Sequence, residues 1–195
     1  MYRDRQDGVL DSGGQDNSAL ITEITGFIKD VYNLAYKLIG NRYDAEDLTQ
    51  DTLMQACKKC GSIKDRTKIR QWLHKITVNL YKNRVRYEIV KKFRMMVPLD
   101  LFTDNEDKYV SKQLMPVEQT FEKDVETKDV VHRALAQMKP DERILIVLCD
   151  IERYTMGDAA KMLGLSRGTV QPRVHSARES FRKIVLCEEA KSEVK

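Results

Sequence analysis

The sequence predicts an all-α protein built from two small helical modules that are joined by an acidic, flexible linker. Apolar residues recur at spacings of three, four or seven in several long segments, which is typical of helices with one buried face. No run of alternating apolar and polar residues rich in Val, Ile and Thr indicates a strand. Between Pro98 and Val125, seven acids face three lysines, with two prolines and no firm periodicity, which favours a linker.

The expected organisation follows from where periodicity starts and stops. The first residues are polar, contain Gly and Asp and lack periodicity, which indicates a mobile tail. We expect a tail at 1–19, a first module at 20–94, the linker at 95–125, a second module at 126–187 and a tail at 188–195. A chain of 195 residues has room for two such modules, each with a modest core.

The composition excludes several classes of protein. The chain contains 42% hydrophobic and 33% charged residues. No stretch reaches 18 consecutive apolar residues, so no membrane insertion is expected. Charges and glycines occupy the N-terminus where a signal peptide needs an apolar core, so a cytoplasmic location is the default expectation. The four cysteines do not make a disulfide framework in a chain this long.

The first module begins with two predicted helices. One starts at Leu20 and ends at Gly40-Asn41, where a left-handed residue is expected. The next starts at Asp44 as its cap, with Leu48, Thr52, Ala56 and Cys60 on one buried stripe. Polar and acidic residues crowd its first two turns, where they suit the helix dipole and equally suit docking of a basic partner: Asp44, Glu46, Asp47, Gln50 and Asp51.

A basic helix from Arg70 to Arg94 is the most distinctive segment. It carries eight cations against one acid, a net charge of +7, whereas the whole chain is only +4. A concentration of one sign of charge on a helix repels itself, and its usual partner is a polyanion. Its predicted buried stripe is Ile69, Leu73, Ile76, Leu80, Tyr87 and Val90, with the cations and asparagines largely on the other face. For the single tryptophan, Trp72, core packing is the simplest expectation.

The second module has the pattern of a helix-turn-helix. One helix stops before Lys139-Pro140, and Pro140 then suits the first turn of a deeply buried apolar helix. A short helix from Asp158 to Leu163, a turn at Gly164, a cap at Ser166 and a longer helix to about Val185 follow. Five cations face one acid on that last helix, which indicates major-groove binding.

This order of parts resembles a bacterial RNA polymerase sigma factor of the small extracytoplasmic-function (ECF) group. The segments that carry the resemblance are DAEDLTQDTLMQA, WLHKITVNLYKNRVR, the acidic linker, LAQMKPDERILIVL and GTVQPRVHSAR, in that order, between Ile24 and Leu186. Such proteins consist of two helical modules called regions 2 and 4. The resemblance implies core RNA polymerase and promoter DNA as partners, no catalysis, and no cofactor or metal.

The resemblance also implies roles for residues of the first module. The acidic set, from Asp44 to Asp51, would dock on the clamp helices of the polymerase largest subunit. The basic helix would bind the melted strand of the downstream (−10) promoter box, where amides discriminate base edges and cations attract phosphates. The implied contacts are Trp72, Lys75, Asn79, Lys82, Asn83 and Arg86. The preceding loop would hold a flipped base, through Ser62, Ile63, Lys64, Asp65, Arg66 and Lys68.

In the second module the resemblance implies reading of the upstream (−35) box while the module body contacts the polymerase flap. The implied residues are Arg167, Thr169, Gln171, Arg173, His175, Ser176 and Arg178. Gln171, Pro172 and Ser176 depart from the residues usual in the family. Counted from a cap at Ser166, Pro172 lies past the first turn, so we expect either a later helix start or a kink.

Two other readings stay open on sequence alone. A stand-alone helix-turn-helix regulator explains residues 126–187 but leaves the basic helix without a role. A redox or metal-responsive protein built on Cys57 and Cys60 lacks a second CxxC, and we expect both cysteines to be structural packing residues. Many members of the family are held by an anti-sigma factor, which we therefore also expect as a partner.

Overall fold

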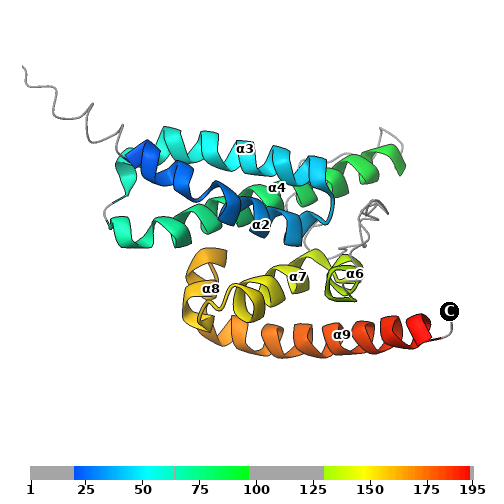
Figure 1. Cartoon of the computed structure of the whole chain (residues 1–195). Coiled ribbons are helices and arrows are strands. Elements are labelled where there is room, and N and C mark those ends of the chain that lie inside the picture. Colours follow the sequence, from blue (N-terminus) through cyan, green and yellow to red (C-terminus); the bar gives the residue numbers. More distant parts are fainter. Residues whose placement is uncertain (1–19, 64, 97–129, 194–195) are drawn as a thin grey trace, which may run out of the picture.

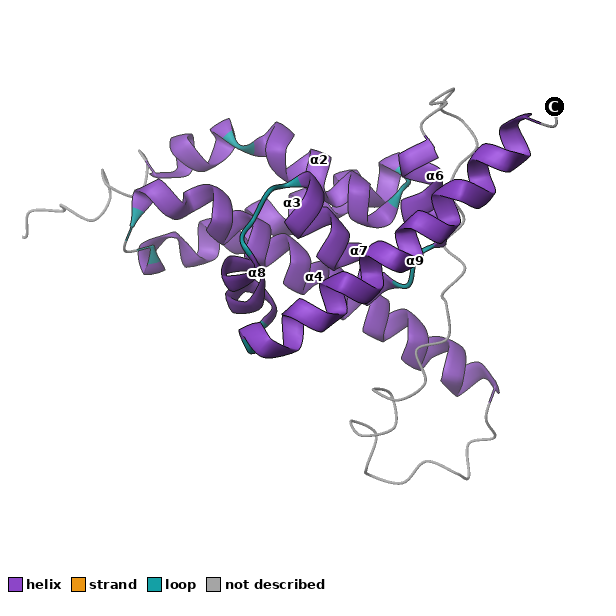
Figure 2. Cartoon of the chain, turned by 90° about the horizontal axis from the view of Figure 1, so that it is seen from below, coloured by secondary structure: helices purple, strands orange, loops and turns teal. Residues whose placement is uncertain are grey.

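The computed structural model describes residues 20–63, 65–96 and 130–193, and all regular structure among them is helical. The helices form two layers (Figure 1): α2, α3 and α4 of the first module lie in one, and α6 to α9 of the second module lie in the other. Figure 2 shows the same helices from below. Residues 1–19, 64, 97–129 and 194–195 lie outside the described residues; these include the expected N-terminal tail and the expected linker apart from residues 95–96, which belong to α4.

The first helix of the sequence is interrupted. Residues 20–26 are helical, Phe27 is a turn, and α2 follows as Ile28–Ile39. Gly40 ends α2 with a φ of 88°, as expected from the sequence. The cap of the next helix was expected at Asp44, which is wrong, because Asn41 accepts the Asp44 N–H at 2.8 Å and α3 spans Arg42–Lys59.

The basic helix, α4, spans Ile69–Met96 and follows two short 3-10 turns at Cys60–Ser62 and Arg66–Lys68. Its buried face differs from the predicted stripe at one end. Tyr81 is 1% exposed and Val85 is buried, whereas Tyr87 is 66% exposed. Both modules pack against α4. The second module covers the side of α4 that carries Tyr81 and Val85, and these two residues are therefore buried.

The second module contains α6 (Val130–Gln137), α7 (Pro140–Ile146), a π-helical turn (Val147–Ile151), α8 (Met156–Leu163) and α9 (Arg167–Glu193). Pro140 occupies the first turn of α7, where its missing N–H leaves no intrahelical bond unmade. Thr155 caps α8 by accepting the Asp158 N–H at 3.1 Å.

The helix-turn-helix forms as predicted between α8 and α9. Gly164 turns the chain with a φ of 68°, and Ser166 accepts the Thr169 N–H at 3.1 Å. The helix α9 continues to Glu193, so it extends past the expected end at Val185 into the expected tail. It begins at Arg167, which excludes a later start, and Pro172 lies inside it, where the carbonyl of Gly168 lacks its usual donor.

The two modules share one hydrophobic core. A single cluster of buried side chains joins Leu34, Leu38 and Tyr81 of the first module to Ile144 and Leu148 of the second. Arg143 of α7 is 2% exposed and donates to the carbonyl oxygens of Leu38, Ala136 and Met138. A second, smaller cluster lies within the first module and includes Ile24, Ala56 and Leu73. In the described residues, no helix has the length and apolar character needed to cross a membrane.

Candidate nucleic-acid interface

The outer face of α4 presents the amide and basic side chains that the sequence singles out. Asn79 and Asn83 are exposed one turn apart, and Lys75 and Arg86 are exposed on the same helix. A rigid helix holds the two amides at a fixed spacing, which suits reading of neighbouring base edges. Among these candidates Trp72 differs, because it is half-buried and packs against the core cluster of the first module.

Tyr87 is an exposed aromatic residue on this face, although it was expected to be buried. Tyr87 follows Asn83 by four residues, so it lies on the same stripe, and 66% of its surface is exposed. The spacing of apolar residues had assigned it to the core. Aromatic rings next to cations provide stacking surfaces for single-stranded bases.

Residues 65–68, directly before α4, are held by a local hydrogen-bond network. Asp65 accepts from the Thr67 N–H at 3.1 Å and from the Thr67 hydroxyl at 2.5 Å, and it pairs with Lys68 at 2.7 Å. These contacts, that of Lys68 above all, lower the pKa of Asp65 to about 2. Ser62 and Arg66 are exposed, and Ile63 packs against the core of the first module.

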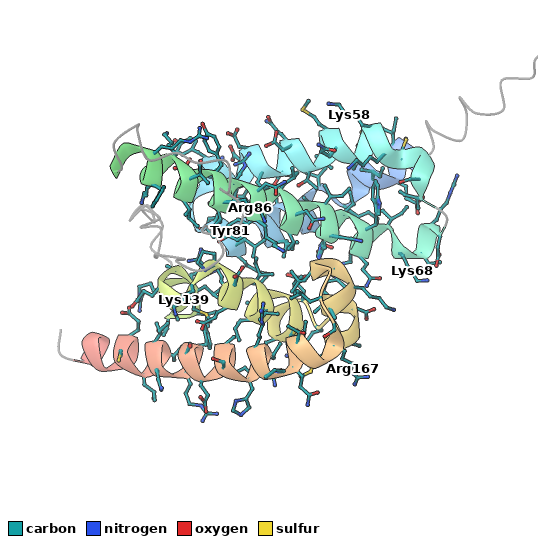
Figure 3. All side chains as sticks on the ribbon, turned by 180° about the vertical axis from the view of Figure 1, so that it is seen from behind. Lys58, Lys68, Tyr81, Arg86, Lys139 and Arg167 are labelled. Atoms are coloured by element: carbon teal, nitrogen blue, oxygen red, sulfur yellow. The ribbon has the colours of Figure 1, made fainter. Side chains whose placement is uncertain are left out.

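The start of α9 presents the candidate upstream-box residues. Arg167, Gln171, Arg173, His175 and Ser176 are all exposed. Figure 3 shows Arg167 at the beginning of α9, at the edge of the layer that faces away from the first module. The exposed side chains on the first turns of α9 are therefore accessible to a groove of duplex DNA.

Two of the upstream-box candidates are held by contacts within the second module. The guanidinium of Arg178 makes two hydrogen bonds to Asp150, at 2.7 and 3.1 Å. The Thr169 hydroxyl lies 2.7 Å from the Ser166 hydroxyl, so it belongs to the cap of α9. Both side chains therefore have a role in the packing of the second module.

The acidic residues of α3 lie on the surface and are partly paired with nearby arginines. Asp44, Asp47, Gln50 and Asp51 are exposed. Arg84 pairs with Asp51 at 2.5 Å, and Arg42 pairs with Glu46 at 2.8 Å. Exposed pairs of this kind contribute little to stability, which leaves the carboxylates available to a partner.

A groove of about 780 Å³ lies between the two modules. Tyr81, Val85, Ile144 and Leu145 are among its apolar lining residues. Cations from both modules also line it, namely Lys82, Arg86, Lys139 and Arg173. Figure 3 shows Tyr81 and Arg86 on α4 across from Lys139 near the start of α7. The groove therefore joins candidates for the downstream box to candidates for the upstream box.

The two cysteines of the CxxC differ in environment. Cys60 is 8% exposed and belongs to the core cluster of the first module, as expected for a packing residue. Cys57 is exposed, so its expected packing role is wrong. Among the described residues, the one group whose geometry suits a metal ion is Asp30, His74 and Glu152, at the contact between the modules.

Comparison with known proteins places both modules in one family. The Sigma-70 region 2 family matches residues 24–88, and the Sigma-70, region 4 family matches residues 128–181. These ranges correspond to the first and second modules, so most of the basic helix falls in region 2 and the helix-turn-helix falls in region 4.

Two curated relatives cover most of the chain. The ECF RNA polymerase sigma factor SigE of Mycolicibacterium smegmatis is 34% identical over 152 residues, 78% of this chain and 56% of the relative. The chain thus spans little more than half the length of that relative. The ECF RNA polymerase sigma factor SigM of Mycobacterium tuberculosis is 31% identical over 157 residues, 80% of this chain and 72% of the relative.

A solved structure has the same fold. It is the sigma factor RpoE in complex with the anti-sigma factor NepR from Bartonella quintana, with a TM-score of 0.57 and 22% identity over 88% of this chain and 96% of that chain. The two matched regions and the identity to SigM over most of both chains lead to one conclusion. This protein belongs to the family of ECF RNA polymerase sigma factors.

Proposed function

We propose that the chain binds core RNA polymerase and directs transcription initiation at specific promoters. Region 2 captures the melted strand of the downstream box, and region 4 reads the upstream box. The observation that carries the proposal is the exposed stripe of α4, where two amides lie one turn apart on a helix of strongly positive charge. The role is one of binding in the cytoplasm, without chemistry of its own.

On the downstream box, the residues divide by what they contact. Asn79 and Asn83 face base edges, since an amide offers a donor and an acceptor side by side. Lys75 and Arg86 attract phosphates without regard to sequence. Tyr87 adds a ring on which an unpaired base stacks, and Trp72 holds the start of α4 in place against the core.

The loop from Ser62 to Lys68 receives the flipped base. The contacts of Asp65 with Thr67 and Lys68 support this proposal, because they hold residues 65–68 in one conformation before DNA arrives. A segment that already has its bound conformation loses less conformational entropy when DNA binds, which favours affinity.

On the upstream box, the exposed side chains at the start of α9 make the contacts. Arg167, Gln171, Arg173 and His175 are exposed along its first turns. Arg178 contributes charge but is held by Asp150, so we give it a supporting role.

Core polymerase binds the acidic surface of α3 through its clamp helices, and the flap contacts region 4. The exposure of Asp44, Asp47 and Asp51 supports the first contact. An anti-sigma factor is a further partner. The groove between the modules, with an apolar floor and cations from both sides, suits an amphipathic, acidic helix.

The test is reconstitution of the purified chain with core polymerase. We expect a stable complex in size-exclusion chromatography and run-off transcripts from a subset of promoter fragments from the source genome. Asp47→Asn combined with Asp51→Asn should weaken the complex, whereas Glu23→Gln, an exposed acid outside α3, should leave it unchanged. Absence of a complex with any core polymerase tested would refute the proposal.

A further inference from the structure

The surfaces that the proposed function assigns to polymerase and to the melted strand lie on two neighbouring helices of the first module. The acidic surface belongs to α3, and the amides Asn79 and Asn83 belong to α4. Under the proposed function, polymerase holds α3 while α4 contacts the strand. The position of α4 along α3 therefore determines where the amides lie relative to the polymerase.

The buried face of α3 is made largely of small side chains. Its buried residues are Ala45, Leu48, Thr49, Thr52 and Ala56, and only Leu48 among them is a large apolar residue. Small side chains form shallow ridges, which specify the axial position of a neighbouring helix less sharply than large ones do. Apolar packing on this face of α3 therefore leaves the register against α4 weakly determined.

A buried pair of threonines joins α3 to α4 within the core. The Thr52 hydroxyl has two acceptors, the Leu48 carbonyl oxygen at 2.7 Å in its own helix and Oγ1 of Thr77 in α4 at 3.4 Å. Thr77 donates in turn to the Leu73 carbonyl oxygen at 2.9 Å. Both threonines are 0% exposed, so their hydroxyls depend on partners within the protein.

At the surface, Arg84 of α4 makes a second contact with α3. Its Nη2 lies 2.5 Å from a carboxylate oxygen of Asp51, and its Nη1 lies 3.3 Å from the carbonyl oxygen of Asp44. Arg84 follows Thr77 by seven residues on α4. Asp44 precedes Thr52 by eight residues on α3, so the helices run antiparallel and the two contacts are about two turns apart. Together they fix the axial position and the rotation of α4 on α3.

A shift of α4 by one turn would separate the threonine hydroxyls. The residues four before and four after Thr77 are Leu73 and Tyr81, which are 0% and 1% exposed. The Thr52 hydroxyl would then face a large, mainly apolar side chain and lose its partner in the neighbouring helix, at the desolvation cost of a buried polar group. Buried polar contacts of this kind select one register where apolar packing tolerates several.

We propose that Thr52, Thr77 and Arg84 are positioning residues that set the register of the strand-reading helix against the polymerase-docking helix. The inference rests on the proposed function for what the two helices bind, but the register is a property of the chain alone. A slip of one turn moves the amides by about 5.4 Å along the helix axis, out of hydrogen-bond reach of a base edge. The cations of α4 attract phosphates over longer distances, so a slip affects base preference more than overall affinity.

A distance measurement on the full chain tests the register without polymerase. Spin labels on Cys57 of α3, which is exposed, and on Lys92→Cys of α4 report the axial offset of the helices by pulsed electron resonance. The other three cysteines are replaced by alanine. We expect one narrow distance for the parent. Thr52→Val combined with Thr77→Val should broaden it or add a second distance about 5 Å away, and Arg84→Met should broaden it less.

Matched controls remove the same chemical groups without affecting a contact between the two helices. Thr49→Val removes a buried hydroxyl of α3 that bonds to the Ala45 carbonyl oxygen of its own helix at 2.7 Å. Arg42→Met removes an arginine whose partner, Glu46, lies at 2.8 Å on the same helix. Both variants should give the distance distribution of the parent. Circular dichroism spectra and melting curves of each variant verify that its helices remain folded.

Base preference of the complex with core polymerase tests the positioning role. The valine pair keeps the shape of the threonine pair and loses both hydroxyls together, so its melting temperature should equal or exceed that of the parent. It should nevertheless discriminate several-fold less among single-base variants of the downstream box, with unchanged salt dependence. Thr52→Ser combined with Thr77→Ser keeps the hydroxyls and should show the reverse, namely a lower melting temperature and the base preference of the parent.

Two results would overturn the proposal. One is a valine pair whose distance distribution equals that of the parent, and the other is a valine pair that keeps the base preference of the parent. The distance result does not depend on whether the chain binds polymerase, so failure of the positioning role and failure of the proposed function can be told apart.

Discussion

The guanidinium of Arg143 lies 2.7 Å from the carbonyl oxygen of Leu38, so a buried cation of region 4 completes the last turn of a helix in region 2. The same side chain donates to Ala136 and Met138 of its own module. Burial lowers the pKa of Arg143, and the interaction with Tyr81 opposes that shift. This residue links the fold of one region to that of the other.

Arg143→Met should lower the free energy of unfolding by about 2–4 kcal/mol, because two buried carbonyl oxygens and one partly buried carbonyl oxygen lose a donor. Urea unfolding followed by circular dichroism measures the change. Arg182→Met, on the exposed side of α9, is the control and should stay within about 0.5 kcal/mol of the parent. Equal effects of the two substitutions would contradict the role of Arg143.

Replacement of Asn79 by alanine should change base preference, whereas replacement of Lys91 by alanine should change overall affinity. Asn79→Ala removes a base-edge contact and should change the preference for bases within the downstream box. Lys91→Ala should weaken all promoters alike and reduce the salt dependence of binding by about 0.7 in the logarithmic slope. Binding of a set of single-base variants of the box at several salt concentrations distinguishes the two. Uniform losses for both variants would refute base readout by Asn79.

Tyr87 should contribute through its ring. Tyr87→Ala should weaken binding of the melted strand by about 1–3 kcal/mol, whereas Tyr87→Phe keeps the stacking surface and should bind nearly as the parent does. Tyr43, exposed on α3 rather than α4, provides the matched control. If Tyr43→Ala and Tyr87→Ala have the same effect, the ring of Tyr87 has no specific place in the interface.

His74 should make stability depend on pH. Burial lowers its pKa to about 4, and the charge of Arg70 adds to that effect, while Glu152 and Asp30 oppose it. Tyr154 faces the same ring, and its pKa is raised to about 12 by burial, so it stays neutral over this range. Because the unfolded chain binds a proton near pH 6.5 and the folded chain does not, stability falls as pH drops from 6.5 toward 4.

Titration of His74 should lower the free energy of unfolding by about 3 kcal/mol between pH 7 and pH 4. His74→Gln should remove this part of the pH dependence, which is measured as the difference between urea midpoints of parent and variant across the range. Titration of groups that do not interact with His74 affects both proteins and cancels in the difference, whereas Asp30 interacts with His74 and titrates differently in the variant. A difference that does not change between pH 7 and pH 4 would show that His74 does not titrate this way.

Two glycines should respond in opposite directions to alanine. Gly164 has a φ of 68° at the turn of the helix-turn-helix, so Gly164→Ala should cost about 1–2 kcal/mol. Gly26 lies in a helical segment, and nothing is within 4 Å of the added methyl group, so Gly26→Ala should stabilise by about 0.5 kcal/mol. Thermal unfolding of both variants decides whether the turn depends on the left-handed residue.

Several helix ends could be predicted from the sequence because local chemistry sets them, whereas α9 extends past its expected end at Val185. Gly40 and Gly164 end helices through their left-handed conformation, and Pro140 starts one. The cap of α3 was expected at Asp44 and lies at Asn41, because both residue types are good caps and only the backbone geometry at Asn41 decides. The π-helical turn at Val147–Ile151 left no mark in the apolar pattern.

The contact between the modules could not be predicted in the same way. Arg70 counted as one more cation of the basic helix, and its partner Glu152 lies 82 residues further along the chain. Tyr87 was expected in the buried stripe and is exposed, whereas Tyr81, which was not in that stripe, is buried. The second module covers one side of α4, and the spacing of residues within α4 contains no information on that cover. Long-range packing, rather than helix propensity, decided which residues of α4 remain available to DNA.

The most direct test of the proposed function is the mapping of transcription start sites after reconstitution with core polymerase on genomic DNA. We expect a set of starts that core polymerase alone does not produce, each preceded by two short shared boxes, with the downstream box altered by Asn79→Ala and the upstream box by Arg173→Ala. Starts identical to those of core polymerase alone, or starts without a shared upstream sequence, would contradict a role in promoter recognition.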